Sequence, residues 1–90
     1  MKRDQANKKD CEIVLQAISD RLDVILREKG WGKFVSPYET VGVLRGNFQR
    51  VEDVVYTNVN DHQELGGELV DMAVAAIFGV VSLRVRKEQT

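Results

Sequence analysis

The stretch that most constrains this chain runs from Glu68 to Leu83, with the sequence ELVDMAVAAIFGVVSL. After Glu68 it holds one charged side chain, Asp71, and its apolar side chains fall on every side of a helix. A helix that is apolar all round has to be buried on most of its faces. The stretch is shorter than the about 20 apolar residues of a membrane span, and Asp71 lies near its start. We therefore expect the central helix of a soluble helical bundle and no membrane partner.

Asp71 needs compensation at the edge of this core. An ionised carboxylate that is buried without a partner costs several kcal/mol. A metal ion, an Arg or Lys side chain, or an open cleft could each compensate it. The sequence leaves these three alternatives open.

A first helix is predicted from about Asp10 to Lys29. Its apolar residues follow the 3, 4, 7 spacing of one helical face: Ile13, Val14, Ala17, Ile18, Leu22, Ile25 and Leu26. Asp10 is the expected cap and Gly30 the expected stop. The polar residues before it, 1–9, are expected to form a flexible lead-in.

A second helix is predicted from Ser36 to about Tyr56 or Thr57. Ser36 caps it, Pro37 takes the first helical position, and Glu39 completes a capping box. One face is apolar and contains Val41, Leu44, Phe48, Val51 and Val55. The opposite face is mixed and contains Glu39, Gly46, Arg50 and Asp53, with Asn47 along its edge.

A third helix is predicted from Asp61, with Glu64 closing another capping box, to about Arg86. We therefore expect an all-α fold, an antiparallel bundle of three main helices in a single domain over residues 10–86, followed by a solvated tail over 87–90.

The composition limits the possible partners and the compartment. The net charge of −1, from 13 basic and 14 acidic residues, gives no electrostatic reason to expect nucleic acid. A single cysteine, Cys11, and the lack of an apolar leader favour a reduced, cytoplasmic protein. A short chain with an all-round apolar helix is expected to gain further burial from copies of itself, as a homo-dimer or tetramer.

Two aromatic residues, Trp31 and Phe34, lie in the first connection between Gly30 and Ser36. One interpretation is that they plug the end of the bundle. The other is that they overhang a pocket and stack on a planar ligand. Both remain open on the sequence.

Glu68 and Asp71 are candidate metal ligands. They are three residues apart, so they lie on the same side of the third helix. Two carboxylates on an otherwise apolar helix suit Mg²⁺, which takes one or two carboxylates and keeps water or phosphate in its other positions.

The order of these motifs resembles a known family. The segment SPYETVGVLRGNFQRVEDVV, a short polar link and then ELVDMAVAAI are similar to the MazG-like all-α nucleoside triphosphate pyrophosphohydrolases, over roughly residues 30–83. In that family a helix with E-E-x-x-E precedes a helix with E-x-x-D. The four acidic positions bind Mg²⁺ ions that hold the phosphates of a nucleotide, and water attacks to give the monophosphate and pyrophosphate. The resemblance also implies a helical dimer or tetramer.

This chain departs from the first half of that motif. The resemblance places the E-E-x-x-E positions on Gly46, Asn47 and Arg50, while Glu68 and Asp71 keep the second half. Arg50 is expected to occupy the place of the metal and to neutralise both carboxylates. Glu39 and Asp53 share the face of Arg50 and are further candidates for metal ligands.

Two functions are therefore expected as alternatives. The first is a MazG-like protein that binds nucleotides through Mg²⁺, with catalysis weak or lost. The second is a non-catalytic oligomeric helical module that binds a partner protein or a small ligand.

Overall fold

The computed structural model describes residues 5–30 and 32–88, and over these residues it consists of three helices with no strand. They are α1 (Lys8–Lys29), α2 (Pro37–Asn58) and α3 (His62–Glu88). The expectation of an all-α fold is confirmed. None of these helices is long and apolar enough to cross a membrane.

The helix α1 begins two residues earlier than expected. Asn7, not Asp10, is its cap: the Asn7 side chain accepts a hydrogen bond from the Asp10 amide, and the Asp10 carboxylate accepts one from the Asn7 amide. Asp10 thus closes a capping box from the third helical position. Of the expected lead-in, residues 1–4 lie outside the described part of the chain, as do residues 89–90 of the tail. Gly30 ends the helix with a positive φ of 84°, and its amide donates to the Leu26 carbonyl.

The predicted caps of α2 and α3 are confirmed. The Ser36 hydroxyl accepts from the Glu39 amide at 3.3 Å, and the Asp61 carboxylate accepts from the Glu64 amide at 3.0 Å. The Glu39 carboxylate accepts from the Val35 amide at 2.6 Å. The side chain of Glu39 is therefore engaged in starting the helix.

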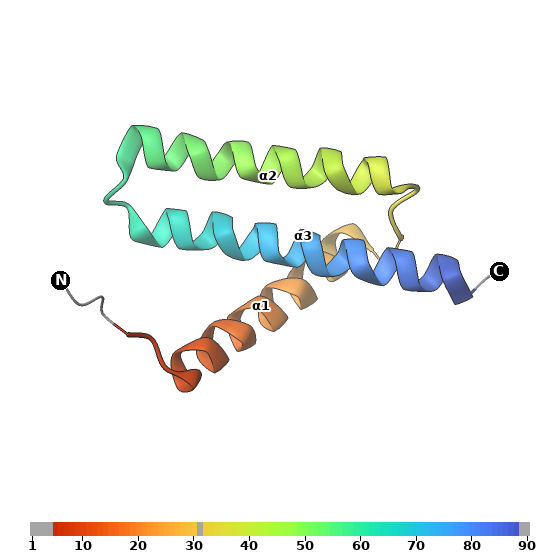
Figure 1. Ribbon diagram of the computed structural model, residues 1–90, viewed down its shortest axis with the longest axis horizontal. Helices are drawn as coiled ribbons and strands as arrows, with labels where there is room; N and C mark the ends of the chain where they lie inside the picture. The colour runs from red at the N-terminus through yellow and green to blue at the C-terminus, as the bar shows by residue number, and fades with distance from the viewer. Residues whose placement is uncertain (1–4, 31, 89–90) are drawn as a thin grey trace.

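The helices α2 and α3 lie side by side and antiparallel, while α1 crosses α3 obliquely (Figure 1). α1 and α2 each pack on α3, but in the described residues no backbone contact joins α1 to α2. The Cα radius of gyration is 15.2 Å, compared with about 12 Å for a compact domain of this length. The three helices therefore form a more open arrangement than the expected bundle.

The core is small. In the described residues, the buried apolar side chains are Leu26, Val54, Val74 and Ala75. The apolar stripe of α1 packs on α3 only through its second half, and Ile13 and Val14 in the first half are exposed. Two polar side chains, Asn47 and Ser82, are buried as well.

The apolar face predicted for α2 is not the face that meets α3. Val41, Phe48 and Val55 on that face are exposed, whereas Asn47 and Val54, along the edge of the mixed face, are buried. Periodicity identified the most apolar side of α2 correctly. It did not identify the side that packs against α3, because the two sides lie about 100° apart around the helix.

The close approach of α2 and α3 depends on Gly79. A Cβ atom at Gly79 would lie 2.7 Å from the Thr40 Cγ2 atom. That distance is well below van der Waals contact, so only glycine allows this separation.

The connection between α1 and α2 is held against α3. The Phe34 amide donates to the Ser82 hydroxyl at 3.0 Å, and this hydroxyl donates to the Phe78 carbonyl at 2.9 Å. The Phe34 and Phe78 rings meet edge to face at 5.1 Å between centroids. Phe34 therefore packs on α3 at the end of the helix pair, whereas Trp31 lies outside the described residues.

Candidate functional site

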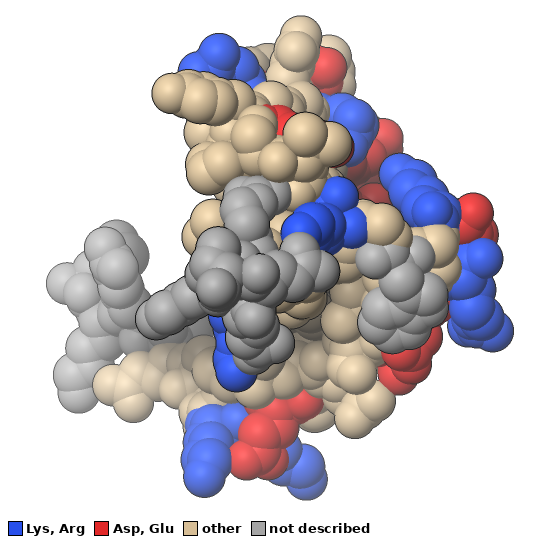
Figure 2. Space-filling model, turned by 90° about the vertical axis from the view of Figure 1, so that its right-hand side faces the viewer, with Lys and Arg blue, Asp and Glu red and all other residues tan. Residues whose placement is uncertain are grey.

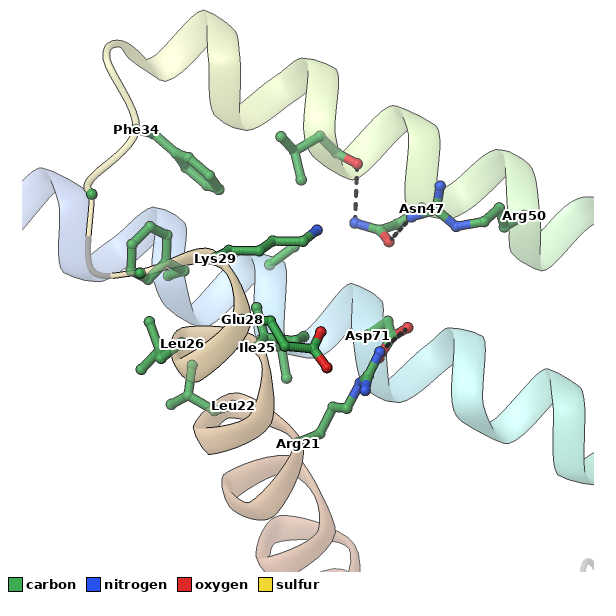
Figure 3. A pocket seen from close by; sticks show the side chains of 16 residues that line it. Arg21, Leu22, Ile25, Leu26, Glu28, Lys29, Phe34, Asn47, Arg50 and Asp71 are labelled. Carbon is green, nitrogen blue, oxygen red and sulfur yellow. Dashed lines mark hydrogen bonds and ion pairs between the residues drawn. The ribbon is translucent and has the colours of Figure 1, made fainter.

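Asp71 is paired with an arginine from α1. The Arg21 Nε atom lies 2.7 Å from the Asp71 Oδ1 atom, and Nη2 lies 3.5 Å from Oδ2 (Figure 3). The Asp71 side chain is 28 % exposed and that of Arg21 is 42 % exposed. Of the three ways to compensate Asp71, the structure therefore uses an ion pair at the edge of the core.

Glu68 is paired with Arg50. The Arg50 Nε atom lies 3.3 Å from the Glu68 Oε2 atom, and Nη2 donates to the Asn47 side-chain oxygen. Asn47 is only 4 % exposed, and its amide nitrogen donates to the Val43 carbonyl at 3.0 Å. The two hydrogen bonds of Asn47 hold the Arg50 guanidinium close to α2.

The sequence predicted that Arg50 would neutralise both carboxylates, and the structure corrects this. Arg50 contacts Glu68, while Asp71 is contacted by Arg21. Glu68 and Asp71 lie one turn apart on α3, and each is approached by a different helix. With one guanidinium per carboxylate, the two positive charges balance both negative charges, which Arg50 alone would not do.

The electrostatic effect of the pair is visible on Arg21. The hydrogen bond to Asp71 and the negative charge of Asp71 raise the pKa of Arg21 above its ordinary value, against a smaller opposing effect of burial. Glu28 and Glu68 add to the increase. Arg21 therefore carries its charge throughout the working pH range.

A pocket of about 270 Å³ lies in the angle between α1, α2 and α3 (Figure 3). Its floor is apolar and includes Leu22, Ile25, Val43, Val74 and Phe78. Its polar lining consists of Arg21, Glu28, Lys29, Asn47, Arg50 and Asp71. An apolar floor with a few polar groups at its edge is typical of a small-molecule site.

The predicted site residues fall into two groups. Phe34, Asn47, Arg50 and Asp71 line the pocket, and Glu68 is joined to it through Arg50. Glu39, Asp53 and Gly46 do not line it: Glu39 caps α2, and Asp53 is exposed. A Cβ at Gly46 would meet open space, so nothing in the described residues requires glycine there.

The donor set for Mg²⁺ is incomplete. Over residues 5–30 and 32–88, no group of three His, Cys, Asp or Glu side chains converges as a metal site would require. Mg²⁺ can bind through two carboxylates, but Glu68 and Asp71 each already face a guanidinium. The residues present therefore do not fit the metal cluster that the resemblance implies.

Sequence reasoning missed Arg21. It lies three residues after Ile18 and four before Ile25, so it interrupts the apolar stripe of the first helix. A charged residue in such a stripe signals a partner of opposite charge in the core. Asp71, the isolated charge on the apolar third helix, is the natural candidate.

Comparison with known proteins identifies no relative. No family model matches the chain, and no curated protein or solved structure matches it significantly.

Proposed function

We propose that this chain is a MazG-like helical protein that has lost two-metal hydrolysis and keeps the pocket between its three helices as a binding site. One observation carries the proposal: each of the two carboxylates that the resemblance assigns to Mg²⁺ is paired with a guanidinium, Asp71 with Arg21 and Glu68 with Arg50. The proposed cellular setting is the cytoplasm, and the proposed assembly is a homo-dimer or tetramer.

The charge of the site argues against bound Mg²⁺. A metal that displaced both arginines from Glu68 and Asp71 would leave two guanidinium groups close to a divalent cation. Their mutual repulsion adds to the cost of breaking two ion pairs. The three family positions at Gly46, Asn47 and Arg50 supply no replacement carboxylate.

The shape and chemistry of the pocket favour a small ligand with an apolar or aromatic part. The apolar floor would bury that part, and Asn47 and the charged side chains at the edge would orient it. A nucleotide is one such ligand, with its base on the floor. Binding of this kind needs no metal.

The alternative is a non-catalytic module that binds a partner protein. The exposed apolar faces of α1 and α2 favour an interaction of that class. In that case the pocket has no ligand, and the two arginines serve only to hold α1 and α2 on α3.

Thermal melting separates these functions. The proposal predicts no rise in Tm with millimolar Mg²⁺ alone, and a rise with a nucleotide that is the same with and without Mg²⁺. A ligand at 100 times its dissociation constant adds about 2.7 kcal/mol of stability. A shift that requires Mg²⁺ would contradict the loss of the metal site, and no shift with any nucleotide would favour the partner-binding module.

A further inference from the structure

Two charged side chains on the rim of the pocket have no bonded partner among the described residues. Glu28 and Lys29 lie in the last turn of α1, and both line the pocket. Neither makes a hydrogen bond or an ion pair over residues 5–30 and 32–88, although the charge of Glu28 acts on Arg21. The rim therefore presents one carboxylate and one ammonium group to a ligand.

The other charged groups of the site are already balanced in pairs. Arg21 is paired with Asp71, and Arg50 is paired with Glu68. With the two rim residues included, the site has as many positive as negative side chains. A ligand with several negative charges gains little from such a site, whereas a ligand with one charge of each sign is complementary to it.

The surface shown in Figure 2 has no excess of one charge either. Along its right-hand side, Lys and Arg side chains are interspersed with Asp and Glu side chains. Among the residues drawn in colour, this face holds no separate cluster of cations that would attract a polyphosphate from a distance. Charge therefore favours a ligand without net charge.

The two rim charges reach different parts of the pocket. Consecutive helical residues point about 100° apart. Figure 3 shows the Lys29 side chain extending toward Asn47 on α2, and the Glu28 carboxylate on the side of Arg21. The Asn47 amide nitrogen carries two N–H groups and donates one to the Val43 carbonyl, which leaves the second for another acceptor. A ligand carboxylate can therefore lie at one place on the rim and a ligand ammonium group at another.

The floor of the pocket suits an aromatic ring. Phe34 and Phe78 both line the pocket, and their rings meet edge to face. A ligand ring can add to such a pair with the same geometry. The volume of about 270 Å³ is at the small end of ligand pockets, which span about 300 to 1,000 Å³. The space therefore fits one small molecule with one ring.

We propose that the ligand of this pocket is a free aromatic α-amino acid. Its carboxylate lies between Lys29 and Asn47, and its ammonium group lies against Glu28. Its ring lies on the floor beside Phe34 and Phe78. The proposal rests on the function proposed above, that the pocket binds a small ligand, and it narrows that ligand to a zwitterion.

Isothermal titration calorimetry with L-phenylalanine on the purified full chain tests the proposal. Two analogues each lack one charge: phenylpropionate has no ammonium group, and phenethylamine has no carboxylate. Each should bind about tenfold more weakly than L-phenylalanine, because each leaves one rim charge without its partner. Glycine, which has both charges but no ring, should show no binding.

Two variants assign each ligand charge to its residue. Lys29→Met should weaken the binding of L-phenylalanine about tenfold and leave that of phenethylamine unchanged. Glu28→Gln should weaken the binding of L-phenylalanine by a similar factor and leave that of phenylpropionate unchanged. A variant that only distorted the pocket would weaken all three ligands together, and that result would overturn the proposal.

Lys9→Met and Glu12→Gln are the matched controls, because both residues are exposed on α1 and neither lines the pocket. Both variants should bind L-phenylalanine as the wild type does, and a loss in either would overturn the proposal. An analogue that binds as tightly as L-phenylalanine would also overturn it. Binding of a nucleotide without binding of L-phenylalanine would overturn the zwitterion but leave the proposed function standing. If neither binds, both proposals fail.

Discussion

The Arg21 guanidinium lies 2.7 Å from the Asp71 carboxylate, and this contact joins α1 to the middle of α3. The two residues are fifty positions apart in the chain. In the described residues no backbone contact joins α1 to α2, so this pair and the apolar residues near Leu26 are the main contacts that hold α1 on α3. The ion pair therefore both neutralises Asp71 and fixes one wall of the pocket.

Replacing Arg21 should loosen α1. Arg21→Gln should lower the free energy of unfolding by about 0.5 to 1 kcal/mol, the value of a partly exposed ion pair. The pKa of Arg21 is raised in the folded chain, so its charge stabilises the fold at every pH below the pKa of the unfolded chain. This stabilisation is lost as the pH rises through the pKa of the folded chain. The difference from wild type should therefore stay constant between pH 7 and pH 10, as measured by urea denaturation.

The control for that experiment is Arg27→Gln. Arg27 is an exposed arginine on the same helix that donates only to the Asp23 carbonyl in the described contacts. It should change stability by no more than a few tenths of a kcal/mol. An equal loss of unfolding free energy in both variants would show that the contact between Arg21 and Asp71 does not stabilise the fold.

Introducing a carboxylate at position 50 should strengthen metal binding. Arg50→Glu removes the guanidinium that faces Glu68 and adds an oxygen ligand, so Mg²⁺ affinity should rise about tenfold, or about 1.4 kcal/mol. The double variant Arg21→Gln/Arg50→Glu should gain more, because Asp71 is then also released. Isothermal titration calorimetry measures both.

Arg45→Glu provides the same charge change on α2 outside the pocket lining. It should leave Mg²⁺ affinity unchanged. A gain equal to that of Arg50→Glu would mean that net charge, and not the site around Glu68, controls binding.

The contact between Gly79 and Thr40 predicts a steric effect. Gly79→Ala should destabilise the chain by about 1 to 3 kcal/mol, because the new methyl group would overlap the Thr40 side chain. The second substitution Thr40→Ala should restore part of this loss. Thermal and urea denaturation give the values.

Gly67→Ala is the matched control on the same helix, since a Cβ there meets nothing within 4 Å. It should stabilise the chain by about 0.5 to 1 kcal/mol, the usual gain from replacing a helical glycine. A stabilising Gly79→Ala would contradict the close approach of α2 and α3.

The buried Ser82 hydroxyl should stabilise the connection between α1 and α2, because it accepts a hydrogen bond from the Phe34 amide. Ser82→Ala removes the acceptor for the Phe34 amide and should cost about 1 to 2 kcal/mol. Ser19→Ala, at an exposed position on α1, should be nearly neutral. Hydrogen exchange at the Phe34 amide should be faster in Ser82→Ala and unchanged in Ser19→Ala. This result would show that the loss of stability comes from the connection between α1 and α2.

Local signals in the sequence predicted the local structure well. Ser36 and Asp61 cap helices as expected, because capping depends on residues within one turn. The start of α1 was predicted two residues late, since both Asn7 and Asp10 are capping residues and only the structure separates their roles. All three helices were nevertheless predicted.

Long-range relationships were predicted less well. The apolar stripe of α2 is real, but the buried face contains Asn47, whose polar side chain is satisfied by Val43 and Arg50. Periodicity cannot tell which of two partly apolar faces has its partner within the same chain. The pairing of Arg21 with Asp71 was missed for the same reason, because nothing local connects them.

We propose that the paired arginines have removed two-metal hydrolysis from this site. This proposal is tested most directly by measuring pyrophosphate release from a panel of nucleoside triphosphates, with Mg²⁺ or Mn²⁺, using the wild-type chain. We expect no release above a protein-free blank. Turnover of about 1 s⁻¹ or more, within the usual range of enzymes, would contradict it.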